Sequence, residues 1–489
     1  MNFADAAKNE AKVTQTTNGM TAYNTTDNGL LDLFSTIGAL RSANTTRIES
    51  LFAEAYKEDP LIATKILFYA RDIRGGLGER RVFKILLKYI AQMHPEALKN
   101  NIRLIPEYGR WDDLYELIGT PLQTDMWDVM REQFHLDEDA LRNNEAPSLL
   151  GKWLKSVDSS SEESKQLGIR TARAFELSVY DYKRVVRALR KAIKIVESQM
   201  SANKWDEINY STVPSRASMI YRNAFTRHDG DRYTEYIQKA INGEEKINSG
   251  TLYPYDLIEK MFESYAWDYK NAIKNDPTVE AQWRQLPNYV EAGTNALVIA
   301  DTSGSMSGRP ICSAIGLALY FAERNTGAFH NMFMNFSNTS SIQIVNGETL
   351  SQKLRNINYK NWGYNTNIEA AMDQILSIGI KNHVPSDEMP KSLIIISDME
   401  FDGCSKGTNC LTMMKQEFES NGYEIPNIIF WNVNSAQNTF HASSNVRGVQ
   451  LVSGQSVSTF KNLIGCIGST PMEMMLKVIN SERYNAITI

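Results

Sequence analysis

The sequence has little of what marks a membrane, secreted or zinc-binding protein. No apolar run approaches the roughly 18 residues that a bilayer-spanning helix needs, so no transmembrane helix is expected. The first residues lack the charged start and apolar core of a signal peptide. The four cysteines have no metal-finger spacing; they are Cys312, Cys404, Cys410 and Cys466. We therefore expect a cytoplasmic protein with reduced cysteines and no membrane partner.

The sequence also lacks an excess of positive charge. With 52 basic and 57 acidic residues, the formal net charge is −5, which excludes a globally basic nucleic-acid binder but allows local patches. The six histidines lie near no nucleophile pattern, so we expect no enzymatic activity. A hydrophobic content of 42% is ordinary for a globular protein, and 489 residues are too many for one core. Two or three domains are expected.

The apolar periodicity divides the chain into three parts. Residues 1–26 are polar and rich in Asn and Thr, which predicts an extended N-terminal arm. Residues 27–290 predict short amphipathic helices, beginning with a capped helix after Asp27 and including a helix start at Pro60. Short helices joined by short loops indicate an α-solenoid of stacked pairs, although no strict sequence period is present. Residues 291–489 have a different apolar periodicity and are expected to form a separate domain.

Short apolar strands alternate with helices from Asn295 onward, which predicts a doubly wound, Rossmann-like parallel sheet. The predicted strands are Leu297–Ala300, Phe329–Phe336, Ser341–Val345, Ser392–Ser397, Asn427–Asn432 and Val449–Val452.

Hard oxygen groups follow the first of these strands in the stretch Asp301-Thr-Ser303-Gly-Ser305. Ligands of open α/β sheets bind at the carboxyl ends of the strands, and such oxygens suit Mg²⁺, Mn²⁺ or Ca²⁺. An ordinary strand-to-turn junction has a similar composition. Two later loops favour the metal: Thr366 lies at the start of a helix, and Asp398 ends another apolar strand.

Basic residues gather in Arg71-Asp-Ile-Arg74-Gly-Gly-Leu-Gly-Glu-Arg80-Arg81. Residues 71–88 contain six basic and two acidic residues, and three glycines allow backbone N–H groups to approach a phosphate. The alternative is a helix-to-helix turn whose arginines pair with nearby carboxylates. The spacing matches no nucleotide fingerprint, so contact with an RNA backbone is the preferred interpretation.

A second basic stretch lies in a helix predicted around residues 179–196. Lys183, Arg187, Arg190 and Lys194 are spaced to share one helix face, and a polyanion would offset their repulsion. Residues 151–227 have fifteen basic and eight acidic side chains, whereas residues 101–150 have four and eleven. The two regions could instead neutralise each other within the protein.

A third group combines basic and aromatic residues, an arrangement that can bind single-stranded RNA. Arg216, Arg222 and Arg227 lie here with Tyr221 and Phe225. The two aromatics are spaced by four, so they could equally be core positions with the arginines solvated.

The ordered set Asp301, Ser303, Ser305, Thr366 and Asp398 closely resembles the metal-ion-dependent adhesion site of von Willebrand factor A domains. The resemblance implies that the three hydroxyls contact the cation and that the two carboxylates act largely through water. One loop departs from the family pattern, because Gly363-Tyr-Asn-Thr366 is one residue longer.

A helical region followed by such a domain resembles the TROVE-module proteins, which include the Ro autoantigens and a related branch in plants, bacteria and phages. The similar motifs are Arg71-Asp-Ile-Arg-Gly-Gly-Leu-Gly-Glu-Arg, Pro106-Glu-Tyr-Gly-Arg-Trp-Asp-Asp, Val213-Pro-Ser-Arg-Ala-Ser, Gly250-Thr-Leu-Tyr-Pro-Tyr-Asp and Trp431-Asn-Val-Asn. The resemblance implies a ring of HEAT-like helical repeats that binds small noncoding or misfolded RNA. The alternative function is a protein scaffold whose cation captures an acidic group of a partner.

Overall fold

The computed structural model describes residues 12–262, 273–336, 340–359, 362, 365–404, 410–463, 466 and 468–489. Its first half is helical and its C-terminal part contains a mixed, mainly parallel sheet. No helix in the described ranges is long and apolar enough to cross a lipid bilayer.

The N-terminal half consists of short helices joined by short loops. They are α2 (Gly29–Thr36), α3 (Thr45–Glu58), α4 (Pro60–Arg71), α5 (Arg81–Met93), α6 (Pro95–Lys99), α7 (Ile105–Tyr108), α8 (Gln123–Arg142), α9 (Leu150–Trp153), α10 (Glu162–Ala174), α11 (Val179–Ala192), α12 (Val196–Ser201), α13 (Ser215–His228), α14 (Gly230–Ile241), α15 (Pro254–Met261) and α16 (Pro277–Arg284). Five 3₁₀ turns lie between them: η1 (Ile37–Ala39), η2 (Ile102–Leu104), η3 (Trp111–Leu117), η4 (Trp205–Glu207) and η5 (Tyr210–Thr212).

Local sequence signals fix where the first helices begin. The side chain of Asn28 caps α2 by accepting a hydrogen bond from the N–H of Leu31 at 2.9 Å. Asp59 caps α4 in the same way, and Pro60 occupies the first turn, where its missing N–H costs nothing.

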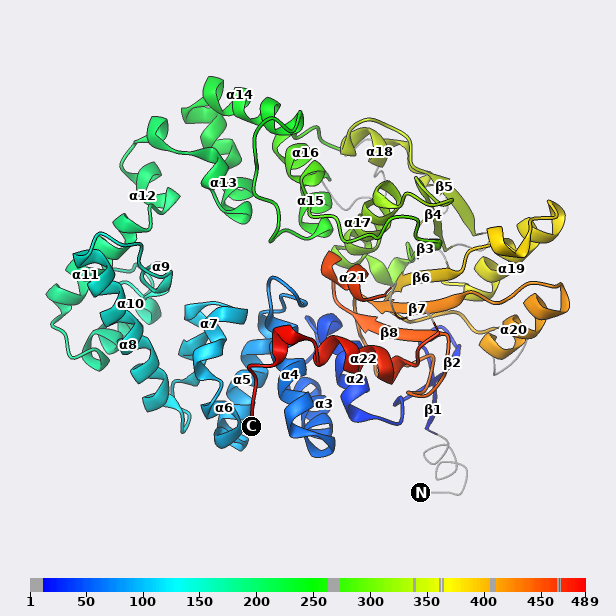
Figure 1. The fold of residues 1–489 in the computed structure, drawn as a ribbon, viewed down its shortest axis with the longest axis horizontal. Helices are drawn as coiled ribbons and strands as arrows, with labels where there is room; N and C mark the ends of the chain where they lie inside the picture. Colours follow the sequence, from blue (N-terminus) through cyan, green and yellow to red (C-terminus); the bar gives the residue numbers. More distant parts are fainter. Residues whose placement is uncertain are drawn as a thin grey trace.

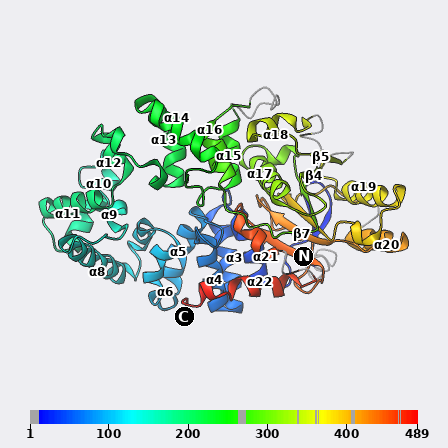
Figure 2. The same cartoon turned by 45° about the horizontal axis from the view of Figure 1, so that its top comes forward.

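The helices follow a curved course that begins and ends against the sheet domain (Figure 1). At the beginning, α2 packs against β8 (Val449–Ser453) and α22 (Pro471–Ile479), and at the end α15 packs against α17 (Arg309–Arg324). Figure 2 shows the same course from another side. One large apolar core runs through the sheet domain and the first helices, and a smaller core joins α12, α13, α14 and α16.

The sheet has six strands in the order β5-β4-β3-β6-β7-β8. The strands not yet given are β3 (Ala296–Ala300), β4 (Met332–Asn335), β5 (Ser341–Ile344), β6 (Ser392–Ser397) and β7 (Asn427–Asn432). The remaining helices and turns are η6 (Gly304–Met306), α18 (Leu350–Asn356), α19 (Ile368–Lys381), η8 (Ser386–Glu388), α20 (Cys410–Ser420), η9 (Val457–Thr459), α21 (Phe460–Leu463) and η11 (Glu482–Tyr484). Five strands are parallel, but β5 pairs antiparallel with β4. The expectation of a wholly parallel sheet is therefore wrong at this edge, where a short connection of a few residues leaves no room for a crossover helix.

Two further expectations differ from the structure. Residues 12–26 do not extend as an arm: β1 (Val13–Gln15) and β2 (Thr21–Tyr23) form an antiparallel hairpin. Its residues bond to the sheet domain, for example through the bridge between Tyr23 and Phe440, because buried backbone groups need partners. Residues 1–11 lie outside the described part. The cysteines were expected to be reduced, yet Cys404 and Cys410 form a disulfide, while Cys312 and Cys466 are free and buried.

Candidate functional site

The carboxyl ends of β3 and β6 form the candidate cation site. These strands are parallel neighbours, with Ala300 paired to Ile396, so Asp301 and Asp398 emerge side by side at one edge of the sheet. The order of strands reverses between β3 and β6, which is where open α/β sheets bind their ligands. Asp301 is fully buried. Its Oδ1 accepts the N–H of Ser303 at 2.9 Å, and its Oδ2 accepts the hydroxyl of Ser397 at 2.5 Å.

The hydroxyl groups predicted as cation ligands lie at the same edge. The Oγ atoms of Ser303 and Ser305 are 3.1 Å apart. Thr366 is completely buried, and its Oγ1 has no hydrogen-bond partner among the described residues. The backbone N–H of Asp402 donates to the carbonyl of Thr366 at 3.0 Å, which joins the second loop to the third. A buried hydroxyl without a partner is costly, so this oxygen is suited to act as a ligand of a cation. Gly363 and Tyr364 lie outside the described residues.

The two carboxylates of this site repel each other in a buried setting. Burial raises the pKa of Asp301, and burial together with the charge of Asp301 raises the pKa of Asp398 to about 7. Neither carboxylate forms an ion pair within the described ranges. A divalent cation would supply the missing positive charge. The described residues contain no group of three or more His, Cys, Asp or Glu placed to hold a metal.

Sequence reasoning missed two carboxylates of the third loop, Glu400 and Asp402. The charge of Asp402 contributes to the raised pKa of Asp301, and one buried oxygen of each side chain has no hydrogen-bond partner in the described structure. Their spacing from Asp398 in Asp398-Met-Glu400-Phe-Asp402 was the available signal. Met399 between them has a φ of +69°, a left-handed conformation that a methionine rarely adopts.

A basic cavity of about 840 Å³ is the second candidate site. Its lining residues come from successive elements along the chain, from the segment after η1 to the start of α17. Eight basic side chains line it against two acidic ones; they are Arg41, Arg71, Arg80, Arg81, Arg110, Lys152, Arg216 and Arg309, with Glu79 and Glu197. Four aromatic residues complete the wall: Trp153, Tyr221, Tyr253 and Tyr255.

Two of the basic side chains of the cavity lie beside Trp153. The guanidinium carbon of Arg110 lies 4.6 Å from the ring centre of Trp153, and the Nζ of Lys152 lies 5.7 Å from it. Neither cation has a carboxylate within ion-pair distance in the described ranges. Burial, followed by the charges of Arg80 and Arg71, lowers the pKa of Arg110. Cations without a carboxylate at ion-pair distance, placed beside an aromatic ring, suit a phosphate and a stacked base.

The first basic stretch forms the turn that the alternative interpretation described. Arg71 and Asp113 form a buried ion pair at 2.7 Å. Arg80 pairs with Asp112, and Arg74 donates to the carbonyl of Glu107. Arg71, Arg80 and Arg81 do line the cavity, but only Arg80 and Arg81 are exposed.

The second basic stretch does not present four cations on one face. Lys183 and Arg187 both reach Asp158, at 2.6 and 3.6 Å. Arg190 turns inward and donates to the carbonyls of Gly151 and Leu154. The helix ends at Ala192, so the expectation that Lys194 continues the face is wrong; Lys194 has a left-handed φ of +53°.

Only one of the three arginines in the third basic group lines the cavity. Arg216 lines the cavity while paired with Asp256, whereas Arg222 pairs with Asp276 at 2.6 Å outside the cavity. Arg227 is exposed and does not line the cavity. The cavity residues Arg41, Arg110, Lys152 and Arg309 were not predicted. The only sequence signal for Arg110 and Lys152 was a Trp close to each.

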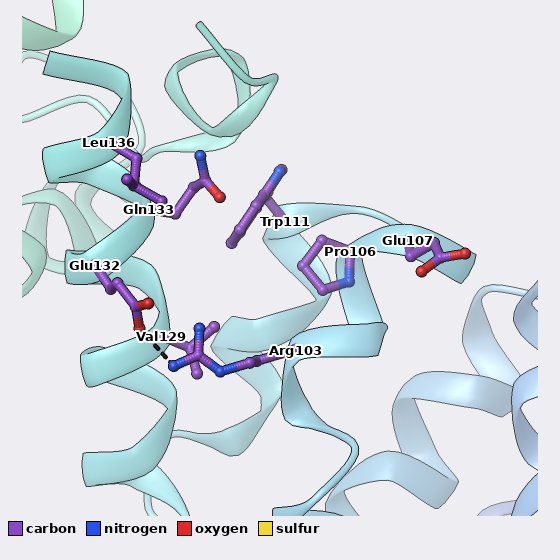
Figure 3. A pocket seen from close by; sticks show the side chains of 8 residues that line it. All are labelled: Arg103, Pro106, Glu107, Trp111, Val129, Glu132, Gln133 and Leu136. Carbon is purple, nitrogen blue, oxygen red and sulfur yellow. Dashed lines mark hydrogen bonds and ion pairs between the residues drawn. The ribbon is translucent and has the colours of Figure 1, made fainter. Parts of the chain in front are cut away.

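A smaller cavity of about 300 Å³ lies between α8 and residues 103–111 (Figure 3). Arg103 and Glu132 face each other across it as an ion pair, beside Trp111 and Pro106. Its two acidic residues, Glu107 and Glu132, outnumber its one arginine. This cavity therefore does not suit a polyanion.

Fold and sites together define a class of protein: short stacked helices joined to an α/β domain with oxygen donors at its strand ends. The family model described as "Domain of unknown function (DUF2828)" matches residues 16–166 and 150–294, more than half of the chain, and the chain belongs to this family. A second model, "Domain of unknown function (DUF7788)", matches residues 295–483.

Two individual proteins are similar over most of the chain. "Uncharacterized protein L728" of Acanthamoeba polyphaga mimivirus is 28% identical over 520 residues, covering 98% of this chain and 89% of that protein. The crystal structure of the Deinococcus radiodurans RO (RSR) protein overlaps 93% of this chain and 99% of its own, with 13% identity and a TM-score of 0.44. An overlap this loose does not define a shared function.

Proposed function

We propose that the protein is a ring-shaped scaffold that binds small noncoding or misfolded RNA. The observation that carries the proposal is the basic cavity, with Arg110 and Lys152 beside Trp153. Cations without carboxylate partners bind phosphates and release counterions, and a half-buried aromatic ring such as that of Trp153 can stack on a base. The TROVE-like sequence motifs point in the same direction.

RNA binding is tested by fluorescence anisotropy of a labelled small RNA with a single-stranded tail. Arg110→Ala and Lys152→Ala should each weaken binding and reduce the slope of log affinity against log salt by about 1. Trp153→Ala should weaken binding by roughly 1–3 kcal/mol with little change in slope. The matched control is Lys415→Ala, because Lys415 is an exposed cation on α20, which contributes no residue to the cavity. Absence of RNA binding by the wild-type protein at low salt would contradict the proposal.

A second function, cation-dependent capture of an acidic group of a protein partner, is favoured by the buried, unpartnered Thr366 hydroxyl, whose loop is bonded to the loop that follows Asp398. Asp301, Ser303, Ser305, Thr366 and Asp398 would hold Mg²⁺, or Mn²⁺ or Ca²⁺, through hydroxyl oxygens and water-mediated carboxylates. The bound cation would act as a Lewis acid toward a carboxylate. Because hydroxyl groups supply three of the five proposed ligands, we propose ligand binding and not hydrolysis.

The cation function is tested by titrating the metal-free protein with Mn²⁺ or Mg²⁺ in a calorimeter. Thr366→Val keeps the shape of the side chain and removes the unpartnered oxygen, so it should weaken binding. Thr326→Val is the control, because Thr326 lies in the loop after α17, on no predicted ligand loop. Equal affinities of the wild type and Thr366→Val would exclude this hydroxyl as a ligand.

A further inference from the structure

The tip of the N-terminal hairpin is hydrogen-bonded to the loop that follows Asp398. The hydroxyl of Thr16 donates to the carbonyl of Phe401 at 2.6 Å and accepts the N–H of Met20 at 2.8 Å. The side-chain amide of Asn18 donates to the carbonyl of Glu400 at 2.6 Å. The carbonyl of Asn18 in turn accepts the N–H of Gly403 at 3.0 Å.

The hairpin also holds a side chain of this loop. The backbone N–H of Thr17 donates to Oε2 of Glu400 at 2.6 Å, and Glu400 is only 4% exposed. Glu400 lies two residues after Asp398 in the same loop. The hairpin therefore fixes the orientation of a buried carboxylate that neighbours a proposed ligand of the cation site.

The loop that the hairpin holds is not in a relaxed conformation. Met399 has a left-handed φ of +69°, a conformation that a residue other than glycine keeps only where surrounding contacts impose it. The carbonyl of Met399 lies 3.0 Å from Nε2 of buried His441, and Asp402 is bonded to the Thr366 loop. The hairpin supplies the hydrogen bonds to residues 400, 401 and 403, between these two attachments.

We propose that Thr16 and Asn18 are positioning residues of the cation site: they keep the 398–403 loop in the conformation in which Asp398 faces Asp301. This inference rests on the proposed cation function. The hairpin contributes no ligand, and it acts by reducing the reorganisation that cation binding requires. Groups that orient a ligand residue typically change metal affinity by about 10–100-fold when removed.

The experiment compares full-length variants by calorimetric titration with Mn²⁺, at a temperature well below every unfolding transition. Thr16→Val conserves shape and removes the hydroxyl, Asn18→Ala removes the exposed amide, and Thr16→Ser restores the hydroxyl. Gln15→Ala is the matched control, because Gln15 is exposed on the same hairpin and its side chain makes no hydrogen bond among the described residues. The unfolding midpoint of each metal-free variant is measured in parallel.

We expect Thr16→Val and Asn18→Ala each to weaken Mn²⁺ binding about tenfold or more, while Thr16→Ser and Gln15→Ala bind as the wild type does. A merely structural hairpin would lower the metal-free unfolding midpoint and leave the affinity unchanged, and that result overturns the inference. If the wild type itself binds no Mn²⁺, the cation function fails and the positioning role fails with it. If Thr16→Val does not fold, Asn18→Ala decides alone.

Discussion

Asp398 is a residue whose charge opposes folding when no cation is bound. Its folded-state pKa of about 7 lies above its ordinary value of 3.8, because it is buried next to Asp301. A raised acid pKa means that ionisation costs stability above pH 3.8, and the full cost is present above pH 7. At pH 8 without metal, Asp398→Asn should therefore raise the free energy of unfolding by roughly 1–3 kcal/mol.

The gain from Asp398→Asn should shrink as the pH falls from 7 to 4, since Asp398 of the wild type then takes up its proton. Thermal unfolding in EDTA and in Mg²⁺ measures both effects: Mg²⁺ should stabilise the wild type and not the variant. Asp387→Asn, at an exposed position in η8, is the control. A variant that is less stable than the wild type in EDTA would contradict the expected repulsion.

Arg71 illustrates a basic residue whose charge serves the fold. Its guanidinium is 2% exposed and its partner Asp113 is fully buried, at 2.7 Å. Arg71→Ala should lower the free energy of unfolding by about 3–5 kcal/mol, because it leaves a buried carboxylate unpaired. Exposed Arg81 is the matched control, with an expected change within about 0.5 kcal/mol. Urea denaturation followed by circular dichroism measures the free energy of unfolding of both variants. If Arg71→Ala is as stable as the wild type, the result would instead favour a role of Arg71 in binding.

At the residue scale, the sequence predicted which two strand-end carboxylates lie near each other, but not which arginines line the cavity. Asp301 and Asp398 follow apolar strands directly, so the geometry of a parallel sheet brings them together. Arg110 and Arg71 depend on contacts with Trp153 and Asp113, which lie about 40 positions along the chain. Nothing in the local pattern distinguishes an arginine with a carboxylate partner from one without.

At the element scale, a pair of glycines sets how closely the helical part approaches the sheet. A Cβ on Gly38 would lie 2.6 Å from the Cα of Gly454, which follows β8. Ser453 connects the same surfaces, since its Oγ accepts the N–H of Gly38 and donates to the carbonyl of Phe34, both at 3.0 Å. Gly38→Ala must therefore move backbone against backbone.

We expect Gly38→Ala to cost about 1–3 kcal/mol through overpacking, seen as a lower unfolding temperature. Gly230→Ala is the control: it lies at the first position of α14, where a Cβ would meet nothing within 4 Å. Its effect should be neutral or slightly stabilising. Equal unfolding temperatures for the two variants would mean that the junction can relax.

Strands were predictable as elements because buried apolar runs bounded by polar turns define them; the predicted and observed limits of β6 and β7 coincide. The hairpin of residues 13–23 was not predictable. Its sequence is polar, and it is ordered by partners such as Phe401 and Phe440, which lie about 400 positions away in the chain. Long-range backbone pairing leaves no local periodicity.

At the scale of the whole molecule, the C-terminal tail returns to the first basic turn. The guanidinium of Arg483 donates to both oxygens of Asp72 at 2.8 and 2.9 Å, and the hydroxyl of Tyr484 donates to Asp72 at 3.2 Å. Further along the tail, the side-chain oxygen of Asn101 accepts a hydrogen bond from the N–H of Thr488 at 3.1 Å. The lengths of the helices do not predict how the helices are arranged in space. That arrangement depends on long-range contacts, such as those between the C-terminal tail and the first helices.

The tail contact can be measured by a double-mutant cycle with Arg483→Met and Asp72→Asn. Burial opposes the ionisation of Asp72, but hydrogen bonds from Arg483 and its charge outweigh burial, so the pKa of Asp72 lies below its ordinary value. The pair therefore stabilises the fold above pH 3.8, and this stability is lost as the pH falls through the lowered pKa. At pH 7 we expect a coupling energy of roughly 1–3 kcal/mol from urea unfolding.

Glu482→Ala supplies the control for this cycle, because Glu482 is exposed in the same turn. Combined with Asp72→Asn, its effect should be additive within about 0.5 kcal/mol. Additive effects of Arg483→Met and Asp72→Asn would instead mean that the contact between these two residues contributes nothing to the stability of the fold. In that case the start of the helical curve is held by the packing of α2 and α4 against α22.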